Sequence, residues 1–347
     1  MHTYPGKSAV GLTCVWALAV TGCSAGSDDG TADAAPPTPA RSESSPSQSA
    51  SSSTSSSTSY APYVSATEAS SYDSAGSPAT YNLAFVIADG SDCTPKWNGT
   101  TALSDAAVKS RIAGLTQGGA TVRVSFGGAS GKELAASCDS ASELAAAYGK
   151  ALDAAGSSQA DFDIEGDELT DADSVDLRSE AIALLQKERG GLEVSFTLPV
   201  MPSGLDDDGV ALLESANEHD VQVSHVNIMT MNYGESYTGD MGDYALTSAK
   251  AAHSQLKEIF GTSDAAAWNA MALTSMLGVN DVDNETFTLD DAAQVREFAE
   301  EKGVGWVSMW AAFRDRECGD DSSSDDALTN CSGVTQGDGA FAEAFSG

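Results

Sequence analysis

Eight short apolar runs alternate with longer mixed segments along most of the chain, and this alternation limits the possible folds more than any other feature. Runs rich in β-branched, aromatic and aliphatic residues predict β-strands, and the segments between them carry helical signals. Strands that alternate with helices predict a parallel sheet of the α/β class. The runs comprise residues 61–66, 81–89, 120–128, 160–166, 192–200, 223–234, 269–279 and 303–313.

Two of the intervening segments carry clear helix boundaries. Residues 171–191 begin with acidic residues and end with basic residues and Gly190, as the helix dipole and glycine caps favour. Thr288 and Asp291 have the spacing of a capping box. Eight strand–helix units within residues 60–347 predict a (β/α)8 TIM barrel, whose active site lies at the C-terminal ends of its strands.

The fourth run places three acids, Asp161, Asp163 and Glu165, at alternate positions, with Phe162 and Ile164 between them. Side chains at alternate positions of a strand point to one side, so in a barrel the acids point inward. Carboxyl groups crowded into a confined site raise the pKa of at least one of them, because like charges cannot all ionise cheaply. Glu165 lies nearest the C-terminal end and is the predicted acid of an active site. An exposed acidic patch is the alternative.

The first 59 residues are expected to precede the folded domain. Residues 1–23 combine Lys7, an apolar run and small residues before Cys23, which is typical of a bacterial lipoprotein signal in which Cys23 becomes lipidated. An ordinary secretory signal or a structural cysteine is the alternative. Residues 24–59 are rich in Ser, Thr and Pro without large apolar side chains and predict a disordered linker. The catalytic domain is then expected over residues 60–347.

The formal net charge of −34 limits the partners. A domain this acidic repels nucleic acid and anionic lipid, so we expect no nucleic-acid partner and membrane contact only through the lipid anchor. The plainer interpretation is that the acids keep an exported domain soluble. We expect an extracellular monomer anchored to the outer face of the bacterial membrane.

Four of the six cysteines lie in the domain and, in an exported protein, predict two disulfides. Three pairings are possible. Cys318 and Cys331 are close in sequence and flank a polar loop, which leaves Cys93 to pair with Cys138. A zinc site is the alternative, but the chain has no C-x-x-C and its histidines do not cluster, so we expect no metal and no cofactor. Residues 280–285 alternate oxygen ligands like a calcium loop but lack other features of an EF-hand, and are interpreted as a polar rim.

Four motifs occur in the order in which one enzyme family carries them. Residues 161–165, DFDIE, resemble the core of its D-x-x-D-x-D-x-E signature, and SFGG at 125–128 resembles its third-strand S-x-G-G. MNY at 231–233 resembles its sixth-strand M-x-Y, and SMW at 308–310 resembles its last strand. The domain is therefore similar throughout to glycoside hydrolase family 18, the chitinases. TLPVMPSGL, TSMLGVND and WAAFRD resemble a bacterial branch of secreted chitinases.

The resemblance implies a mechanism and its residues. Glu165 would protonate the glycosidic oxygen while the sugar's own N-acetyl carbonyl attacks the anomeric carbon, in a retaining, substrate-assisted reaction. Asp163 would hold the acetamido N–H, with Asp161 sharing its proton. Tyr233 would hydrogen-bond the acetamido oxygen.

Three further residues are expected to bind substrate. The resemblance implies that Trp310 stacks under the sugar at the cleaved bond. Strand alternation points Met231 inward together with Tyr233. Trp97, after the second strand, is a candidate to stack a more distant sugar. Ordinary packing in the protein interior is the alternative for all three.

Two positions depart from the family's pattern. Ser158 replaces the first aspartate of the signature, which puts part of the acid relay in doubt. Gly234 follows the motif tyrosine where relatives often carry an acidic or amide residue. The resemblance implies a chitinase that cuts chitin or chito-oligosaccharides, chains of β-1,4-linked N-acetylglucosamine. The alternatives are a silent, lectin-like barrel, whose relatives usually lose the acid that this chain keeps at Glu165, and an endo-β-N-acetylglucosaminidase acting on glycans.

Overall fold

Eight parallel strands close into a barrel in the structure, a computed structural model that describes residues 58–347. β1 and β2 share the place of the first strand: β1 pairs with β13 and β2 pairs with β3, and these pairings close the ring. The predicted (β/α)8 barrel is confirmed, including all eight predicted strands. The barrel strands are β1 (Ser59–Tyr60), β2 (Tyr63–Ser65), β3 (Thr80–Asp89), β6 (Thr121–Gly127), β7 (Gln159–Asp163), β8 (Glu193–Pro199), β9 (Val223–Met229), β10 (Met271–Met276) and β13 (Trp306–Trp310).

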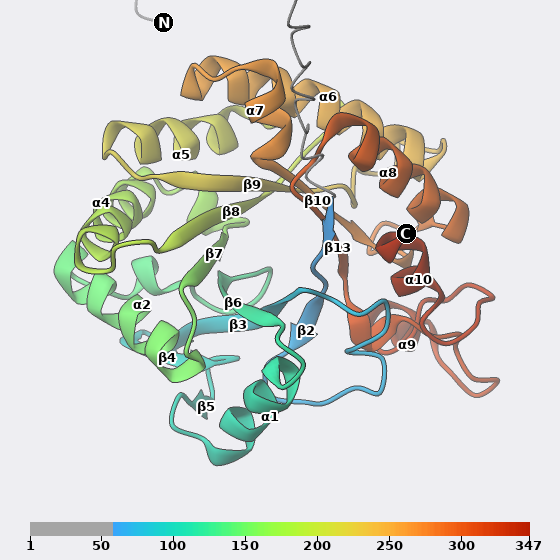
Figure 1. Cartoon of the computed structure of the whole chain (residues 1–347), viewed down its shortest axis with the longest axis horizontal. Coiled ribbons are helices and arrows are strands. Elements are labelled where there is room, and N and C mark those ends of the chain that lie inside the picture. The colour runs from blue at the N-terminus through green and yellow to red at the C-terminus, as the bar shows by residue number, and fades with distance from the viewer. Residues whose placement is uncertain (1–57) are drawn as a thin grey trace, which may run out of the picture. The chain divides into compact units, whose positions relative to one another are not determined.

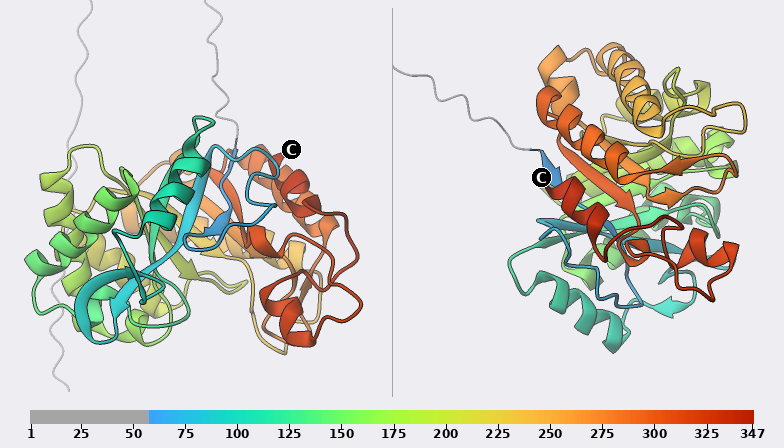
Figure 2. Two further views of the ribbon diagram at one scale, coloured as in Figure 1. Left: turned by 90° about the horizontal axis from the view of Figure 1, so that it is seen from below. Right: turned by 90° about the vertical axis from the view of Figure 1, so that its right-hand side faces the viewer.

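Helices surround the strands on the outside (Figure 1). The long helices are α1 (Ala106–Thr116), α2 (Ala141–Ala155), α4 (Ala172–Glu188), α5 (Asp207–Glu218), α6 (Met241–Phe260) and α8 (Leu289–Lys302). The short ones are α3 (Asp167–Thr170), α7 (Asp264–Asn269), α9 (Ser324–Thr329), α10 (Ala340–Ser346) and the 3-10 helices η1 (Leu134–Ala136) and η2 (Ala312–Arg314). The side views show the C-terminal helix α10 packed beside α8 (Figure 2).

The predicted starts of α4 and α8 are present, but the expected glycine cap at the end of α4 is not: its C-cap is Arg189, and Gly190 does not have a positive φ. The side chain of Asp171 accepts hydrogen bonds from the backbone at the start of α4, which ends at Glu188. Thr288 and Asp291 form the predicted capping box of α8: each side chain accepts a bond from the other residue's backbone N–H. Both caps satisfy backbone donors that the first turn of a helix leaves without partners.

The first strand–helix unit differs from the prediction. Residues 66–79, between β2 and β3, form turns instead of a helix, because this Ser- and Gly-containing segment lacks a continuous apolar stripe to bury. Two antiparallel additions also interrupt the simple alternation. β4 (Asp92–Trp97) and β5 (Thr101–Ala102) extend β3 outward, and β11 (Gly278–Val279) pairs with β12 (Thr286–Phe287) after β10.

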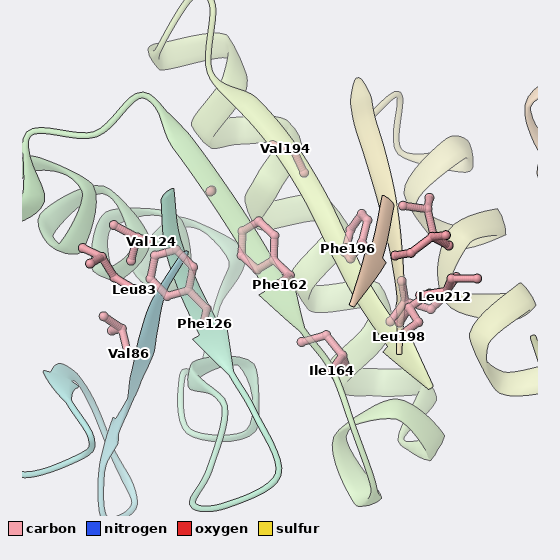
Figure 3. Packing of buried hydrophobic residues seen from close by; sticks show 14 of the residues in the cluster. Leu83, Val86, Val124, Phe126, Phe162, Ile164, Val194, Phe196, Leu198 and Leu212 are labelled. Carbon is pink, nitrogen blue, oxygen red and sulfur yellow. The ribbon is translucent and has the colours of Figure 1, made fainter. Parts of the chain in front are cut away.

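A layer of phenyl rings joins the barrel to its helices. Phe126, Phe162 and Phe196 lie on adjacent strands and form a row between the strands and the helices (Figure 3). Their ring centroids are 5.3 Å apart between Phe126 and Phe162 and 5.7 Å apart between Phe162 and Phe196. Because Phe162 faces outward, its neighbours Asp161 and Asp163 face the barrel interior.

The folded part begins before the predicted boundary at residue 60. Thr58 is buried and donates a hydrogen bond from Oγ1 to the carbonyl of Ala299 at 3.1 Å. The predicted signal, with Cys23, and the predicted linker up to residue 57 lie outside the described residues. Within residues 58–347, no helix has the length and apolar character needed to cross a membrane.

Candidate active site

The three acids of the DFDIE motif lie in order along β7 and the residues after it, toward the mouth of the barrel. Asp161 and Asp163 lie in β7 and are almost fully buried, while Glu165 follows the end of the strand and is half-buried. Glu165 is thus the most exposed of the three acids. The sequence-based prediction of the order in which the acids approach the mouth agrees with their burial.

Four hydroxyl groups donate hydrogen bonds to the carboxylate of Asp161. Tyr63 and Ser125 donate to its Oδ2 at 3.0 and 2.6 Å, and Ser195 and Thr197 donate to its Oδ1 at 2.7 and 2.9 Å. These four donors come from the adjacent strands β6 and β8 and from β2, and they occupy both oxygens of the carboxylate. Sequence reasoning missed this ring; its signal was the small polar residues in the inward positions of the strands.

Asp163 and Glu165 are hydrogen-bonded to each other through their carboxyl groups. Burial raises the pKa of Asp163 well above its ordinary value, and the charges of Glu165 and Asp161 raise it further. Burial also raises the pKa of Glu165. Two carboxyl groups can share a hydrogen bond only if one is protonated, so the pair holds a proton at the barrel mouth. The resemblance implied that Asp163 shares its proton with Asp161; in this structure Asp163 bonds to Glu165 instead.

A concave pocket opens above this pair. Its inner part encloses about 100 Å³, and a neighbouring hollow on the β8 and β9 side encloses about 190 Å³. Glu165 lines both parts, so it lies where they meet. The inner part is lined by Tyr63, Phe85, Ala129, Asp163, Glu165, Thr197, Met229, Met231, Asn232, Thr274, Met276, Asp281 and Trp310.

Aromatic rings form one wall of the pocket. The half-buried ring of Trp310 stacks on Phe85, with centroids 5.5 Å apart, and meets Tyr63 edge-on at 5.8 Å. Trp310 therefore lines the same pocket as Asp163 and Glu165, and its stacking on a sugar stays a prediction. An aromatic wall next to carboxyl groups is an arrangement that can hold the apolar face of a sugar ring while its polar groups are bonded.

Comparisons with known proteins identify the family to which the chain belongs. The sequence is 34% identical over 275 residues to the "Probable bifunctional chitinase/lysozyme" of Escherichia coli (strain K12), a match that covers 74% of this chain but only 31% of that protein. The catalytic domain of the hyperthermophilic chitinase from Pyrococcus furiosus is 30% identical and has a TM-score of 0.73, with 83% of this chain and 94% of that chain covered. The chain belongs to glycoside hydrolase family 18.

A further solved structure is similar to this chain in its fold alone. A GH18 chitinase from Pseudoalteromonas aurantia shares its fold at a TM-score of 0.57 and 16% identity, over 73% of this chain and 94% of that one. No family model matches the sequence.

The predicted role of Tyr233 is wrong for this family 18 chain. β9 ends at Met229, so strand alternation no longer applies at residue 233. Tyr233 is buried, and its hydroxyl accepts a hydrogen bond from Ser248 of α6 at 3.4 Å, away from the pocket. Met231 lines the pocket as expected, together with Met229 and Asn232. The motif thus brings Met231 and Asn232, not its tyrosine, to the site.

Asn232 belongs to a clamp between two loops that sequence reasoning missed. Its Nδ2 donates to Asp281 Oδ2 at 2.9 Å, and the backbone N–H of Asp281 donates to Asn232 Oδ1 at 3.0 Å. The backbone N–H of Gly234 donates to Glu285 Oε1 at 2.8 Å. Gly234 has a φ of 111°, which favours glycine and explains this departure from the family's pattern. The 280–285 segment, interpreted as a polar rim, therefore supports the pocket.

Trp97 and Ser158 lie away from the pocket. Trp97 is fully buried on β4, opposite Val86 of β3, so its predicted contact with a distant sugar is wrong: no face of its ring is open. Ser158 is exposed just before β7, at the end of the strand opposite Glu165. The substitution of this first signature residue therefore leaves the acids at the mouth unchanged.

Both predicted disulfides are present. Cys93 of β4 is bonded to Cys138, which follows η1, and Cys318 is bonded to Cys331 on either side of α9. Among residues 58–347, no three His, Cys, Asp or Glu side chains are grouped so that they could hold a metal ion. The carboxyl groups at the mouth are instead paired with each other or with hydroxyls.

Proposed function

We propose that the chain hydrolyses β-1,4-linked N-acetylglucosamine chains, as chitin or chito-oligosaccharides, and retains the configuration of the anomeric carbon. Its family and its likeness to chitinases support this type of reaction. The observation that carries the proposal is the placement of the buried carboxyl group of Asp163 and the half-buried one of Glu165 in the same pocket as Trp310. Cleavage of a glycosidic bond requires a positioned acid of this kind.

Glu165 acts first as the acid and then as the base. It gives its proton to the glycosidic oxygen as the bond to the anomeric carbon breaks, and the acetamido carbonyl oxygen of the same sugar bonds to that carbon, forming an oxazolinium ion. The shortened chain leaves with the proton. Water then attacks the anomeric carbon and gives a proton to the Glu165 carboxylate, which restores the acid and the acetamido group.

Asp163 orients the attacking group. Its Oδ1 is buried and has no hydrogen-bond partner, which makes it the acceptor for the acetamido N–H of a bound sugar. That bond turns the carbonyl oxygen toward the anomeric carbon and faces the positive oxazolinium with a carboxyl group. Asp161, held by its four hydroxyl donors, adds negative charge behind Asp163. An amide nitrogen has two hydrogens, so Asn232 can bond the acetamido oxygen while it holds Asp281.

Product analysis tests this proposal against its two alternatives. The protein is incubated with chitohexaose and, separately, with a high-mannose glycopeptide, and the products are identified by mass spectrometry and by NMR of the first anomer formed. We expect shorter chito-oligosaccharides with the β-anomer first and an intact glycopeptide. Cleavage of the glycopeptide alone would identify an endo-β-N-acetylglucosaminidase, and chitohexaose that binds without being cut would identify a sugar-binding barrel.

A further inference from the structure

The interior of the barrel contains a buried cation that the proposed reaction does not use. Arg123 of β6 is buried, and it is the only lysine or arginine in the barrel strands named above. Taking a charged side chain out of water costs much free energy unless an opposite charge compensates for it. The question is therefore which negative charge compensates for Arg123.

The guanidinium of Arg123 lies inside the barrel at its floor, which is the end opposite the pocket. Its Nη1 donates to Asn82 Oδ1 on the adjacent strand β3 at 2.7 Å. Its Cζ lies 4.0 Å from the centroid of the Trp306 ring, and Trp306 is the first residue of β13. Because β13 is not adjacent to β6 in the sheet, the side chain of Arg123 reaches across the barrel interior.

The direct partners of this guanidinium are neutral. The amide of Asn82 and the π-face of Trp306 satisfy part of a buried cation, but neither carries a negative charge. Arg123 has no carboxylate at ion-pair distance among residues 58–347. The arginines that do form ion pairs there are Arg111, Arg178, Arg189 and Arg296.

Asp161 lies one layer of side chains above Arg123. Arg123 and Ser125 point to the same side of β6, and Ser125 donates to Asp161 Oδ2 at 2.6 Å. Two residues of a strand span about 6–7 Å, which is the spacing between these layers. Opposite charges at this spacing attract in a packed barrel interior, where little water screens them. Burial lowers the pKa of Arg123, and the charge of Asp161 opposes this more than that of any other neighbour.

The other titratable groups around the guanidinium do not supply a buried negative charge. The rings of His225 and Trp306 have centroids 4.4 Å apart, and burial, together with the charge of Arg123, lowers the pKa of His225 to about 4. His225 is thus neutral at pH 7. Burial raises the pKa of Tyr63 well above its ordinary value, so its hydroxyl is neutral too. Glu193 is exposed at the start of β8, where water screens its charge.

We propose that Arg123 is a positioning residue for the reaction: its buried charge stabilises the carboxylate of Asp161, and with it the negative charge behind Asp163. This inference rests on the proposed function, in which Asp163 faces the positive oxazolinium ion. Arg123 does not line the pocket, so it touches neither the sugar nor the reacting atoms. Because it acts through Asp161, its loss should lower kcat more than it weakens substrate binding.

Two variants of Arg123 separate its charge from its packing. Arg123→Gln and Arg123→Lys both keep a donor for Asn82, but only the lysine keeps the charge. We expect Arg123→Gln to lower kcat for chitohexaose roughly tenfold, with KM within about twofold of wild type. Arg123→Lys should keep kcat within about threefold of wild type. Arg189→Gln, outside the barrel after α4, is the control and should leave kcat unchanged. Equal losses of kcat for Arg123→Gln and Arg123→Lys would overturn the proposal.

The effect on kcat should depend on Asp161. The Asp161→Asn variant lacks the charge that Arg123 stabilises, so adding Arg123→Gln to it should cause no further loss of kcat. If Arg123→Gln costs the same factor with and without the Asp161 carboxylate, Arg123 does not act through Asp161 and the proposal is wrong.

Melting temperatures test the two charges without any turnover. Removing either member leaves the other buried without its opposite charge, so Arg123→Gln and Asp161→Asn should each lower the melting temperature by about 4 °C or more. The double variant should lose less than the sum of the two losses. Arg123→Met, which fills a similar volume without charge, replaces Arg123→Gln if that variant does not fold.

This cycle separates failure of the inference from failure of the proposed function. Coupled losses of melting temperature support the interaction of Arg123 with Asp161 even if the wild-type protein cuts no chitohexaose, in which case only the proposed function fails. Losses that simply add would overturn the inference, whatever the protein hydrolyses.

Discussion

The carboxyl group of Asp163, the last residue of β7, is hydrogen-bonded to that of Glu165, the more exposed acid of the pair. Burial raises the pKa of both groups, and raises that of Asp163 further above its ordinary value. Both shifts favour the protonated form of a carboxyl group in the pocket that Trp310 lines.

Asp163→Asn should raise stability and lower activity. The raised pKa means that the ionised form of Asp163 is less favourable in the folded chain than in the unfolded chain. This cost to stability is absent below the ordinary pKa and grows as pH rises toward the folded-state value. We expect the variant to melt about 2–4 °C higher than wild type at pH 7, with the difference vanishing near pH 4. Activity should fall roughly 10²- to 10³-fold.

Calorimetric melting curves at several pH values check the effect on stability. Asp167→Asn is the matched control, because Asp167 is exposed on α3 and its charge carries no burial cost. An Asp163→Asn variant that melts below wild type at pH 7, or a gain in stability that is the same at pH 4, would contradict the assignment of the buried charge.

Asp281→Asn should move the pH dependence of catalysis. The charge of Asp281 contributes to raising the pKa of Glu165, after the larger effect of burial. Removing that charge lowers the pKa of Glu165, so the acid loses its proton at lower pH. We expect the alkaline limb of the kcat/KM profile to shift to lower pH, since this limb reports loss of the acid's proton. The variant's amide oxygen can still accept from Asn232.

Asp283→Asn is the control for this shift. Asp283 is exposed in the same loop and does not line the pocket, so its loss changes the charge of the loop without changing the site. Superimposable pH profiles for wild type and Asp281→Asn would show that Asp281 does not act on Glu165.

Tyr233→Phe should leave kcat/KM for chitohexaose within about twofold of wild type. The lost hydroxyl bonds Ser248, whose Oγ also donates to the carbonyl of Tyr244 at 2.9 Å, so no buried donor is left alone. Asn232→Ala, which opens the clamp at Asp281, should lose at least ~10-fold, the scale of one positioned hydrogen bond. A larger loss of kcat/KM for Tyr233→Phe than for Asn232→Ala would show that Tyr233 acts in the site and would contradict this assignment.

Cys23 tests the proposed attachment to the membrane. In a bacterial host, the wild-type protein should partition with membranes into detergent, because the VTGC sequence favours lipidation of Cys23. Cys23→Ala should be soluble or unprocessed. If the two proteins partition identically, the prediction that Cys23 is lipidated is wrong.

The barrel was predictable because its signals are local. Each strand is a short apolar run, and the capping box of Thr288 and Asp291 needs only four consecutive residues. The order of the acids followed from the twofold period of a strand. The disulfides followed from chain separation: once Cys318 and Cys331 pair, one pairing remains for the other two.

The sequence did not predict the parts of the site whose positions depend on the residue at which a strand ends. Alternation predicted an inward Tyr233, but β9 stops at Met229 and the chain turns through Asn232, whose φ is 55°. The bond of Asn232 to Asp281 joins loops 49 residues apart, which no local pattern reports. Trp97 follows the predicted second strand, and the antiparallel β4 strand that carries it was not predicted because it contains proline and lysine, residues disfavoured in strands.

The rate at which Glu165→Gln hydrolyses chitohexaose tests the central claim most directly. Glutamine is nearly isosteric with glutamate but has no proton to give, so sugar binding and the fold should persist while hydrolysis falls at least ~10²-fold. Calorimetric binding of chitohexaose and an unchanged circular dichroism spectrum would establish that only the chemistry is lost. A Glu165→Gln variant that hydrolyses chitohexaose at the wild-type rate would contradict the assignment of Glu165 as the acid.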